Sequence, residues 1–483
     1  YYDLKSIKSQ ISLFQSFLPI FCLVLLLTYN VFVFGNSAMD GSNQFILLIG
    51  ASIGVLIGFK NNITFKSMIN DVSSNLKSIT GAILILLMVG SLSGTWLISG
   101  IIPSMIYYGL QVLNPTIFLP SCLIICAIIS VSTGSSWTTS ATVGIALIGI
   151  GKALGIPAGM VAGAVISGAY FGDKLSPLSD TTNLSPAVSG TDIFTHIRYL
   201  TITTVPTIIV TIIILSILNF FTEINGSTEN EFMLSAIKST FYVSPLLFIV
   251  PFIVVLMIFK KTPPLIALFA GTILGAVFAL IFQIDTLNQI SENNEQSINN
   301  IYKTILNAIT VETNIESGNP VLNELFSSGG MKGMLNTIWL VICAMVFGGI
   351  MEAIGALKQI SNFLLNLGKS TFSVFASTVG SCLAINLTAS DQYLSIVIPG
   401  KMFSKAYKDK GLAPENLSRT LEDAGTVTSV LIPWNTCGAY QAGILGVSVF
   451  DYFIYAIFNW LSPFTTLLVA AINYKIKKLK ATK

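Results

Sequence analysis

The stretch ISGAYFGDKLSPLSDTTNLSPAVSGTD, residues 166–192, joins an apolar, glycine-rich run to a dense polar segment. Ser176 and Pro177 end the apolar run, because proline lacks a backbone donor and breaks a helix. The residues that follow supply hydroxyl, carboxylate and amide oxygens next to hydrophobic sequence. Polar, non-helical backbone at membrane depth is tolerated only where it is buried in protein or lines a wet cavity. The stretch therefore predicts a helix that breaks inside a membrane protein.

The rest of the chain has the composition of a membrane protein. Of its 483 residues 53% are hydrophobic and only 10% are charged, whereas soluble domains are about 25% charged. We therefore expect an all-α polytopic membrane protein with discontinuous helices at the midplane. Apolar runs near the ~20 residues needed to cross hydrocarbon lie at 11–34, 44–59, 78–102, 116–133, 138–151, 157–175, 192–220, 241–259, 263–284, 335–357, 372–390, 393–407, 415–433 and 450–474.

Charge and motif content exclude several function classes. The formal net charge is +3 and the basic residues form no continuous stripe, which excludes a nucleic-acid binder. His196 is the single histidine and no Cys-x-x-Cys pair exists, so a zinc site is not expected. No Walker A motif is present, which argues against direct driving by ATP. We therefore expect neither an enzyme nor a cofactor.

Basic residues in the loops orient the predicted spans. The segment 60–77 contains three lysines and the end of the chain contains five, whereas 35–43 contains none. Because cytoplasmic loops are enriched in Lys and Arg, we predict that both termini and 60–77 lie in the cytoplasm. An acidic connector at 223–240 and a longer acidic insert at 285–334 then lie outside the cell. Lys152 is at odds with this arrangement.

The two halves of the chain have matching layouts and opposite predicted orientations, since 78–102 runs outward and its counterpart 335–357 runs inward. We expect two inverted-topology transmembrane repeats, at 1–222 and 241–483, separated by the connector. Such repeats are typical of secondary transporters, whose sites lie near the midplane. Residues that correspond at a constant offset of 256 include Trp137 and Tyr393, Pro177 and Pro433, Gly190 and Gly446, and Phe194 and Phe450.

Polar interruptions occupy corresponding positions in the two halves. The first pair lies at 132–137 and 388–393, and the second at 172–183 and 428–438. Backbone carbonyls freed at such breaks, together with hydroxyls, are the hard oxygen ligands that a small cation prefers. For the first pair the alternative is an ordinary polar turn at the membrane surface.

Three aspartates in these breaks are the leading candidate ligands. A carboxylate at membrane depth is costly unless it is paired or wetted, so it marks a functional site. Asp180 and Asp391 have no basic residue within four positions, and we predict that they bind Na+. Asp173 precedes Lys174, and pairing between these neighbours is the alternative to an ion-binding role. The counterparts of Asp180, Asp391 and Asp173 at the same offset are all hydroxyl residues, namely Thr436, Ser135 and Ser429.

Neighbouring polar residues complete the predicted site. Glu422 and Asp423 are expected to play a structural role instead, because Arg419 lies one helical turn away from both. The further residues predicted to bind the ion or the proton are Thr181, Asn183, Ser135, Thr388, Asn435 and Thr436. If the substrate is a small organic acid, the residues predicted to hold its carboxylate are Ser132, Ser176 and Lys174, with help from half-helix N-termini.

The segments FGDKLSPLSDTTNLSPAV at 171–188 and GTDIFTHI at 190–197 resemble the NhaC-type sodium/proton antiporter family of the ion transporter superfamily. LIPWNTCG at 431–438 is also similar to that family, and the resemblance extends over essentially the whole chain. It implies a bacterial inner-membrane antiporter that exchanges Na+ for H+. The family also includes members that look like malate/lactate antiporters, so the resemblance defines the transport class better than the substrate.

Two transport functions follow from these observations. The first is a Na+/H+ antiporter in which cation and proton compete for buried carboxylates. The alternative is a Na+-coupled or proton-coupled exchanger or symporter of a small organic acid such as malate or lactate. A membrane enzyme is disfavoured, because metal, P-loop and nucleophile-elbow motifs are missing. The expected partners are Na+, H+ and the lipid bilayer, without nucleic acid, and a homodimer is left open.

Overall fold

The computed structural model describes residues 11–222, 227–291, 297–317, 323 and 325–479, which are almost entirely helical. The first half contains α1 (Leu13–Phe34), α2 (Ser42–Lys60), α3 (Phe65–Ser78), α4 (Thr80–Ile98), α5 (Ile101–Val112), α6 (Phe118–Thr133), α7 (Ser136–Thr139), α8 (Ile145–Ala153), α9 (Ala158–Leu175), α10 (Asp180–Ser189) and α11 (Ile193–Phe221). The second half contains α12 (Ser227–Thr240), α13 (Ile249–Phe259), α14 (Pro264–Phe282), α15 (Ile284–Ile290), α16 (Ile298–Thr310), β1 (Thr313–Asn314), β2 (Ser327–Ser328), α18 (Gly330–Gly333), α19 (Leu335–Ala353), α20 (Ala356–Asn366), α21 (Thr371–Thr388), α22 (Gln392–Asp409), α23 (Pro414–Leu421), α24 (Thr436–Leu445), α25 (Val449–Tyr452) and α26 (Ile457–Ala471).

Within the described ranges, eight helical stretches are long and apolar enough to cross a membrane, which confirms the expected all-helical, multi-span class. They comprise α1, α2, α4, α6, α11, α14, α19 and α21, with short extensions at the starts of α6 and α19. A ninth span arises if the bent pair 231–240 and 245–259, whose halves meet at 81°, counts as one.

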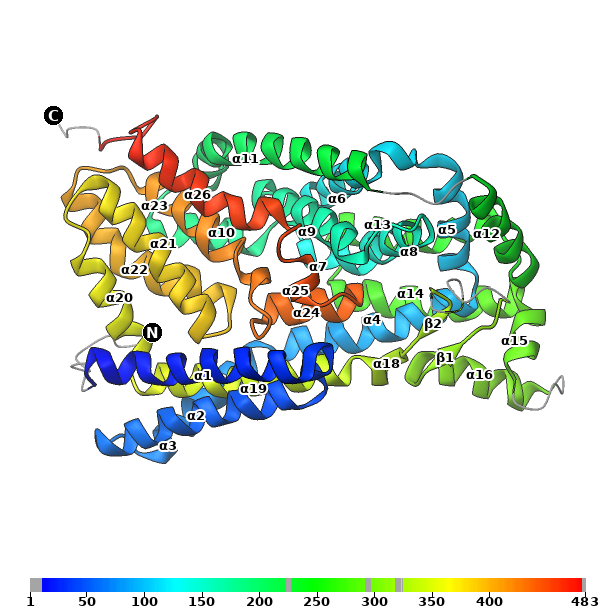
Figure 1. Cartoon of the computed structure of the whole chain (residues 1–483), viewed down its shortest axis with the longest axis horizontal. Helices are drawn as coiled ribbons and strands as arrows, with labels where there is room; N and C mark the ends of the chain where they lie inside the picture. The colour runs from blue at the N-terminus through cyan, green and yellow to red at the C-terminus, as the bar shows by residue number, and fades with distance from the viewer. Residues whose placement is uncertain (1–10, 223–226, 292–296, 318–322, 324, 480–483) are drawn as a thin grey trace.

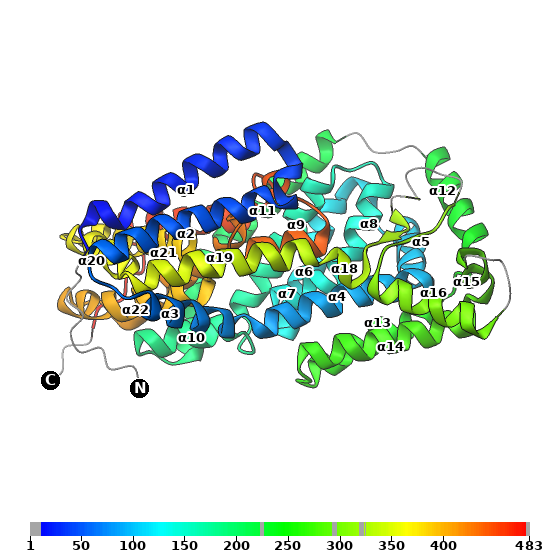
Figure 2. The same cartoon turned by 90° about the horizontal axis from the view of Figure 1, so that it is seen from below.

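Most of the long helices run roughly along the long axis of the molecule, whereas α5, α12 and α15 run across it (Figure 1). In that view α1, α2, α3 and α19 lie together along one edge and α11 lies along the opposite edge. Both views place α12, α15 and α16 at one end of the long axis and α20, α21 and α22 at the other (Figure 2). Helices α1, α2, α3 and α19 share a separate apolar core, which includes Leu47, Met68, Phe347 and Ile350.

Helix breaks recur at the offset of 256 residues. Gly134 (φ +70°) and Ser390 (φ +58°) adopt the left-handed conformation at the ends of α6 and α21. The residues that cap the next helices also correspond. Ser135 and Asp391 are the N-caps of α7 and α22, and Ser179 and Asn435 are the N-caps of α10 and α24.

Two interhelical hydrogen bonds obey the same offset. Ser130 Oγ on α6 donates to the Ala169 carbonyl on α9 at 2.6 Å. Asn386 Nδ2 on α21 donates to the Gly425 carbonyl at 2.7 Å. In each half, therefore, a polar side chain on the helix before the first break donates a hydrogen bond to the backbone of the helical segment before the second break.

Small residues allow α6 and α9 to pack closely. A Cβ atom added at Gly168 would lie 2.1 Å from the Leu123 carbonyl oxygen, and one at Gly172 would lie 2.5 Å from that of Ala127. These distances are shorter than any real contact, so the two helices meet backbone to backbone, as is common in membrane proteins.

Several segments differ from the spans and loops expected from the sequence. The predicted loop 60–77 contains α3, whose apolar face packs against α19. The predicted span 415–433 is broken, because α23 gives way to a π-helical segment, Glu422–Thr426. Helix α12 occupies much of the predicted connector, and the insert carries α15, α16 and the antiparallel pair β1–β2. Parts of these predicted regions, and both predicted cytoplasmic ends, lie outside the described residues at 1–10, 223–226, 292–296, 318–322, 324 and 480–483.

Candidate ion-binding site

A cavity of about 690 Å³ lies where the broken helices meet. Three carboxylates line it, those of Asp173, Asp180 and Asp391, and Lys261 is the single Lys or Arg in its described lining. Its hydroxyl and amide groups come from Thr133, Ser135, Thr138, Ser179, Thr181, Gln392 and Thr436, among others. The cavity therefore has more acidic than basic side chains and many oxygen atoms, and it contains the three aspartates singled out in the sequence.

Asp173 connects the two breaks of the first half. It lies near the end of α9 and is largely buried. Its Oδ2 accepts hydrogen bonds from the N–H (3.1 Å) and the Oγ (2.7 Å) of Ser136, the first residue of α7. The alternative pairing with Lys174 is wrong, because Lys174 bonds to a different carboxylate.

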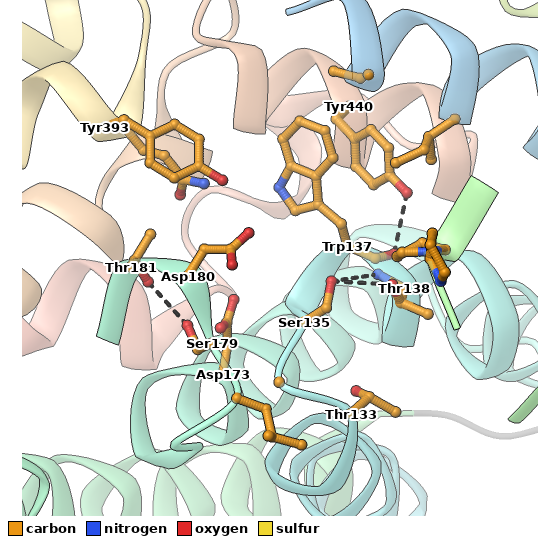
Figure 3. A pocket seen from close by; sticks show the side chains of 18 of the residues that line it. Thr133, Ser135, Trp137, Thr138, Asp173, Ser179, Asp180, Thr181, Tyr393 and Tyr440 are labelled. Atoms are coloured by element: carbon orange, nitrogen blue, oxygen red, sulfur yellow. Dashed lines mark hydrogen bonds between the residues drawn. The ribbon is translucent and has the colours of Figure 1, made fainter. Parts of the chain in front are cut away.

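Asp180 is the first residue of α10 and is exposed to the cavity. Ser179 caps this helix and lies 3.2 Å from the hydroxyl of Thr181, measured between the two side-chain oxygens. The Asp180 and Asp173 carboxylates point into the same space, with Tyr393 and Ser135 on opposite sides of it (Figure 3). Two carboxyl groups therefore face one region of the cavity.

Asp391 supplies the acidic group of the second half. It caps α22, since its Oδ1 accepts a hydrogen bond from the Leu394 N–H at 2.9 Å, and it lines the cavity. Thr436, the first residue of α24, donates its N–H to the Ser390 carbonyl at 2.9 Å. The two breaks of the second half are thus joined beside Asp391.

Six residues predicted for the site do not line the cavity, and five of them are hydroxyl or amide residues. Each of these five uses its side chain for a local hydrogen bond, as Ser, Thr and Asn residues commonly do near helix ends. Ser132 donates to Ile128, Thr388 donates to Ala384, Ser176 accepts from Leu178, Asn183 donates to Pro177 and Ser179, and Asn435 caps α24 and donates to Asn386. These residues shape the breaks around the cavity.

Lys174 is fully buried and turned away from the cavity. Its ammonium group forms an ion pair with Asp423, contacts Ser462 Oγ at 3.2 Å and lies 5.5 Å from the centre of the Phe458 ring. The predicted role of Lys174 in holding an organic acid in the cavity is therefore not supported by its position.

The expected pairing of Arg419 with Glu422 or Asp423 is wrong. Arg419 is fully buried, and its three guanidinium nitrogens have no hydrogen-bond partner. Its central carbon lies 4.7 Å from the centre of the Tyr199 ring, at a distance typical of a cation–π contact. Asp423 takes Lys174 as its partner instead, across 249 positions of sequence.

Aromatic side chains also line the cavity, although none of them was predicted for the site. Trp137 and Tyr440 stack with ring centres 3.8 Å apart, and the Tyr440 hydroxyl donates to the Trp137 carbonyl at 3.2 Å (Figure 3). Tyr393 lies across from them. Trp137 and Tyr393 directly follow the first pair of breaks and correspond at the repeat offset, which was the signal that could have identified them.

The aspartates do not form a compact metal centre. Among the described residues, no three His, Cys, Asp or Glu side chains gather closely enough to hold a metal ion. A cation held by one or two of these carboxylates would take its remaining ligands from hydroxyl and carbonyl oxygens, as hard cations do.

Comparison with known proteins assigns the family. Residues 168–473 match the Na+/H+ antiporter family, and this range contains all three cavity aspartates. The Na+/H+ antiporter NhaC of Alkalihalophilus pseudofirmus is 37% identical over 89% of this chain and 90% of its own length. The chain belongs to the NhaC family of Na+/H+ antiporters. It is therefore a secondary transporter and a multi-pass membrane protein, as the sequence resemblance implied.

Relatives of this NhaC family chain differ in substrate. The malate-2H+/Na+-lactate antiporter of Bacillus subtilis is 36% identical over 95% of this chain and 94% of that protein. The arginine/ornithine antiporter ArcD of Halobacterium salinarum is 32% identical over 96% of this chain and 92% of that protein. Because relatives at this level of sequence identity have different substrates, the substrate of this chain has to be inferred from its site.

Proposed function

We propose that this protein exchanges Na+ for H+ across the cell membrane and binds both at the carboxylates of the cavity. The observation that carries the proposal is the charge of that cavity, in which three aspartates face one lysine. A carboxylate that holds Na+ cannot hold a proton at the same oxygens, so each ion displaces the other. Asp180 and Asp391 are the proposed Na+ ligands, supported by Asp173, Ser135, Thr181 and Thr436, which line the same cavity.

The lining favours a cation over an organic acid such as malate or lactate. Carboxylates in the cavity repel a carboxylate substrate, and the buried cation nearest in sequence to them, Lys174, is engaged by Asp423. Lys261 is the one basic group left in the described lining, and it belongs to the loop between α13 and α14. The organic-acid alternative would need the cavity to gain positive charge.

A cationic amino acid is the second candidate substrate. The cavity of about 690 Å³ falls within the roughly 300–1,000 Å³ of small-molecule sites, far more than a bare Na+ fills. Aromatic faces attract organic cations, and Trp137, Tyr393 and Tyr440 line the cavity beside the carboxylates. The similarity to an arginine/ornithine antiporter agrees with this candidate.

The proposed transport cycle uses the two halves as inverted repeats, at 1–222 and 241–483. Support comes from the helix caps and hydrogen bonds that recur at the 256-residue offset around the cavity. Both termini are proposed to be cytoplasmic. Ser78 lines the cavity and directly follows the segment 60–77, which is proposed to be cytoplasmic, and this position supports an inward-open state. Movement of one bundle against the other would then expose the site to the opposite side.

Ion flux in proteoliposomes tests the proposed function. We expect Na+ added to one side of vesicles that contain the purified protein to move across the membrane and to drive protons in the opposite direction, toward the side to which Na+ was added. Malate or lactate should have no effect on this flux. Proton movement driven by arginine or ornithine in place of Na+ would favour the second candidate, and movement driven by malate or lactate would reverse the assignment.

A further inference from the structure

Glu422 is a buried carboxyl group that the cation cavity does not contain. It begins the π-helical segment Glu422–Thr426, and none of its surface is exposed. Its Oε1 accepts a hydrogen bond from Ser185 Oγ at 2.7 Å, whereas its Oε2 has no hydrogen-bond partner. π-helical turns are rare and are frequent at functional sites.

The basic groups near Glu422 are engaged elsewhere. Lys174 pairs with the adjacent Asp423. Arg419, three residues earlier, stacks over Tyr199 and gives no hydrogen bond to Glu422. A buried ionised carboxylate without a counter-ion is strongly destabilising, whereas a neutral carboxylic acid is tolerated. The neighbouring acids thus differ in state: Asp423 is a paired ion, and Glu422 is suited to carry a proton.

The groups around Glu422 can be named element by element. Helix α26 contributes no titratable side chain between Ile457 and Ala471, and α10 contributes the hydroxyl of Ser185. The titratable or charged groups around Glu422 and Asp423 are Asp173 and Lys174 on α9, His196 on α11, Cys382 on α21 and Arg419 on α23, with Tyr407 on α22 next to Cys382 and Arg419.

Two helices connect Glu422 to the cavity. Helix α10 begins with the cavity residue Asp180 and carries Ser185, the partner of Glu422, a little more than one turn later. Helix α9 carries the cavity residue Asp173 directly before Lys174, whose ion pair with Asp423 lies next to Glu422, so a negative charge on Asp173 would act on Glu422. Na+ bound at Asp173 would offset that charge and favour an ionised Glu422. A proton on Glu422 would in turn weaken the attraction of the region for Na+.

We propose that Glu422 is a proton-binding site separate from the cation cavity, and that it releases its proton to water when Na+ binds. This inference rests on the proposed Na+/H+ exchange and names a second proton carrier for it. The carboxylic acid loses its proton to water and becomes a carboxylate as Na+ enters, and the carboxylate takes up one proton from water again as Na+ leaves, with no other change in bonding.

The variant Glu422→Gln tests the inference, because an amide keeps the shape and the hydrogen bond to Ser185 but cannot titrate. We expect Na+ still to bind, while the number of protons released per Na+ bound, measured by calorimetry in buffers of different ionisation enthalpy, falls by up to one. Na+-driven proton flux should fall by the same fraction as the number of protons released per Na+. The matched control is Glu415→Gln, a buried glutamate on α23 that pairs with Lys477 and should behave like the wild type.

A second readout separates this inference from the proposed function. Infrared difference spectra between acid and alkaline pH should contain the carbonyl stretch of a buried carboxylic acid, lost in Glu422→Gln and retained in Glu415→Gln. That result without any Na+-driven flux in the wild type would support Glu422 and contradict Na+/H+ exchange. Normal flux, proton release and infrared band in Glu422→Gln would overturn the role of Glu422 alone. If Glu422→Gln does not fold, Ser185→Ala replaces it, and an unchanged pH profile of exchange in that variant overturns the role.

Discussion

At the scale of single residues, the cavity aspartates combine a structural with a chemical role. Asp391 caps α22 and Asp173 holds the first residue of α7, while both line the cavity. Asp180 begins α10 and is exposed to the cavity. Their place on rigid helix ends fixes the carboxylates relative to one another, which a site that selects ions requires.

Replacing Asp180 or Asp391 by Asn should abolish exchange without unfolding the protein. Each variant removes one negative charge from the cavity, and we expect Na+-driven proton flux to fall at least about tenfold, the effect of losing about 1.4 kcal/mol of ion binding. Asn is as good a helix cap as Asp, so Asp391→Asn should retain the wild-type melting temperature.

The matched control for these variants is Asp451→Asn, an exposed aspartate on α25 that does not line the cavity. Its flux should equal that of the wild type. Near-normal flux in both cavity variants would mean that the ion binds elsewhere.

The aspartates could be predicted from the sequence because a carboxylate beside apolar runs is conspicuous. Their polar neighbours were harder to assign. Asn183 and Thr388 have suitable oxygens, but each bonds to backbone within six positions, a competition that composition does not reveal. The partner of Lys174 could not be predicted either, since Asp423 lies 249 residues away and is brought close only by tertiary packing.

At the scale of helices, hydrophobic runs predicted the eight spans and the bent pair that the described residues contain. Five other predicted spans are not among the described helices long and apolar enough to cross a membrane, namely 138–151, 157–175, 393–407, 415–433 and 450–474. Polar clusters predicted the helix breaks. Helices α3 and α12 were missed because both are rich in polar residues and lack the long apolar run of a span. The π-helical segment after α23 was also missed, since no local pattern distinguishes it from a continuous helix. The aromatic lining formed by Trp137 and Tyr440 depends on contact between the two halves.

The close contact of α6 with α9 predicts the effect of a single methyl group. Gly168→Ala would place its Cβ 2.1 Å from the backbone of α6, so the helices must separate. Overpacking of this kind costs about 1–3 kcal/mol, and the apparent melting temperature in detergent should fall.

Gly380→Ala is the control for this helix contact, because its Cβ would meet side chains of α20 only at ordinary distances of 3.8 Å or more. Its melting temperature should stay level or rise, since Ala favours a helix over Gly by roughly 0.5–1 kcal/mol. Equal stability of the two variants would contradict the backbone contact between α6 and α9.

At the scale of the whole molecule, the cavity joins segments from both halves of the chain. Its aspartates come from α9, α10 and the break before α22, so charge and volume could not be predicted from any one stretch of sequence. The repeat layout indicated which segments would meet. The volume of the cavity and the orientation of the Lys174 side chain could be determined only from the structure.

The proposed orientation predicts which positions an impermeant thiol reagent reaches from outside intact cells. In a background without the six native cysteines, Asn299→Cys on α16 should be labelled and Ser67→Cys on α3 should not. Both positions are exposed, and α16 and the start of α3 lie toward opposite ends of the molecule (Figure 1). Labelling of Ser67→Cys but not of Asn299→Cys would reverse the orientation.

The Na+ affinity of the purified protein as a function of pH, measured by calorimetry, tests the central claim most directly. If cation and proton compete for the cavity carboxylates, protonation removes the Na+ site. The affinity should then weaken on the acid side by about tenfold per pH unit for each proton displaced and reach a constant value at alkaline pH. A Na+ affinity that stays constant from alkaline pH down to about pH 3.5, below the ordinary aspartate pKa of about 3.9, would contradict the competition.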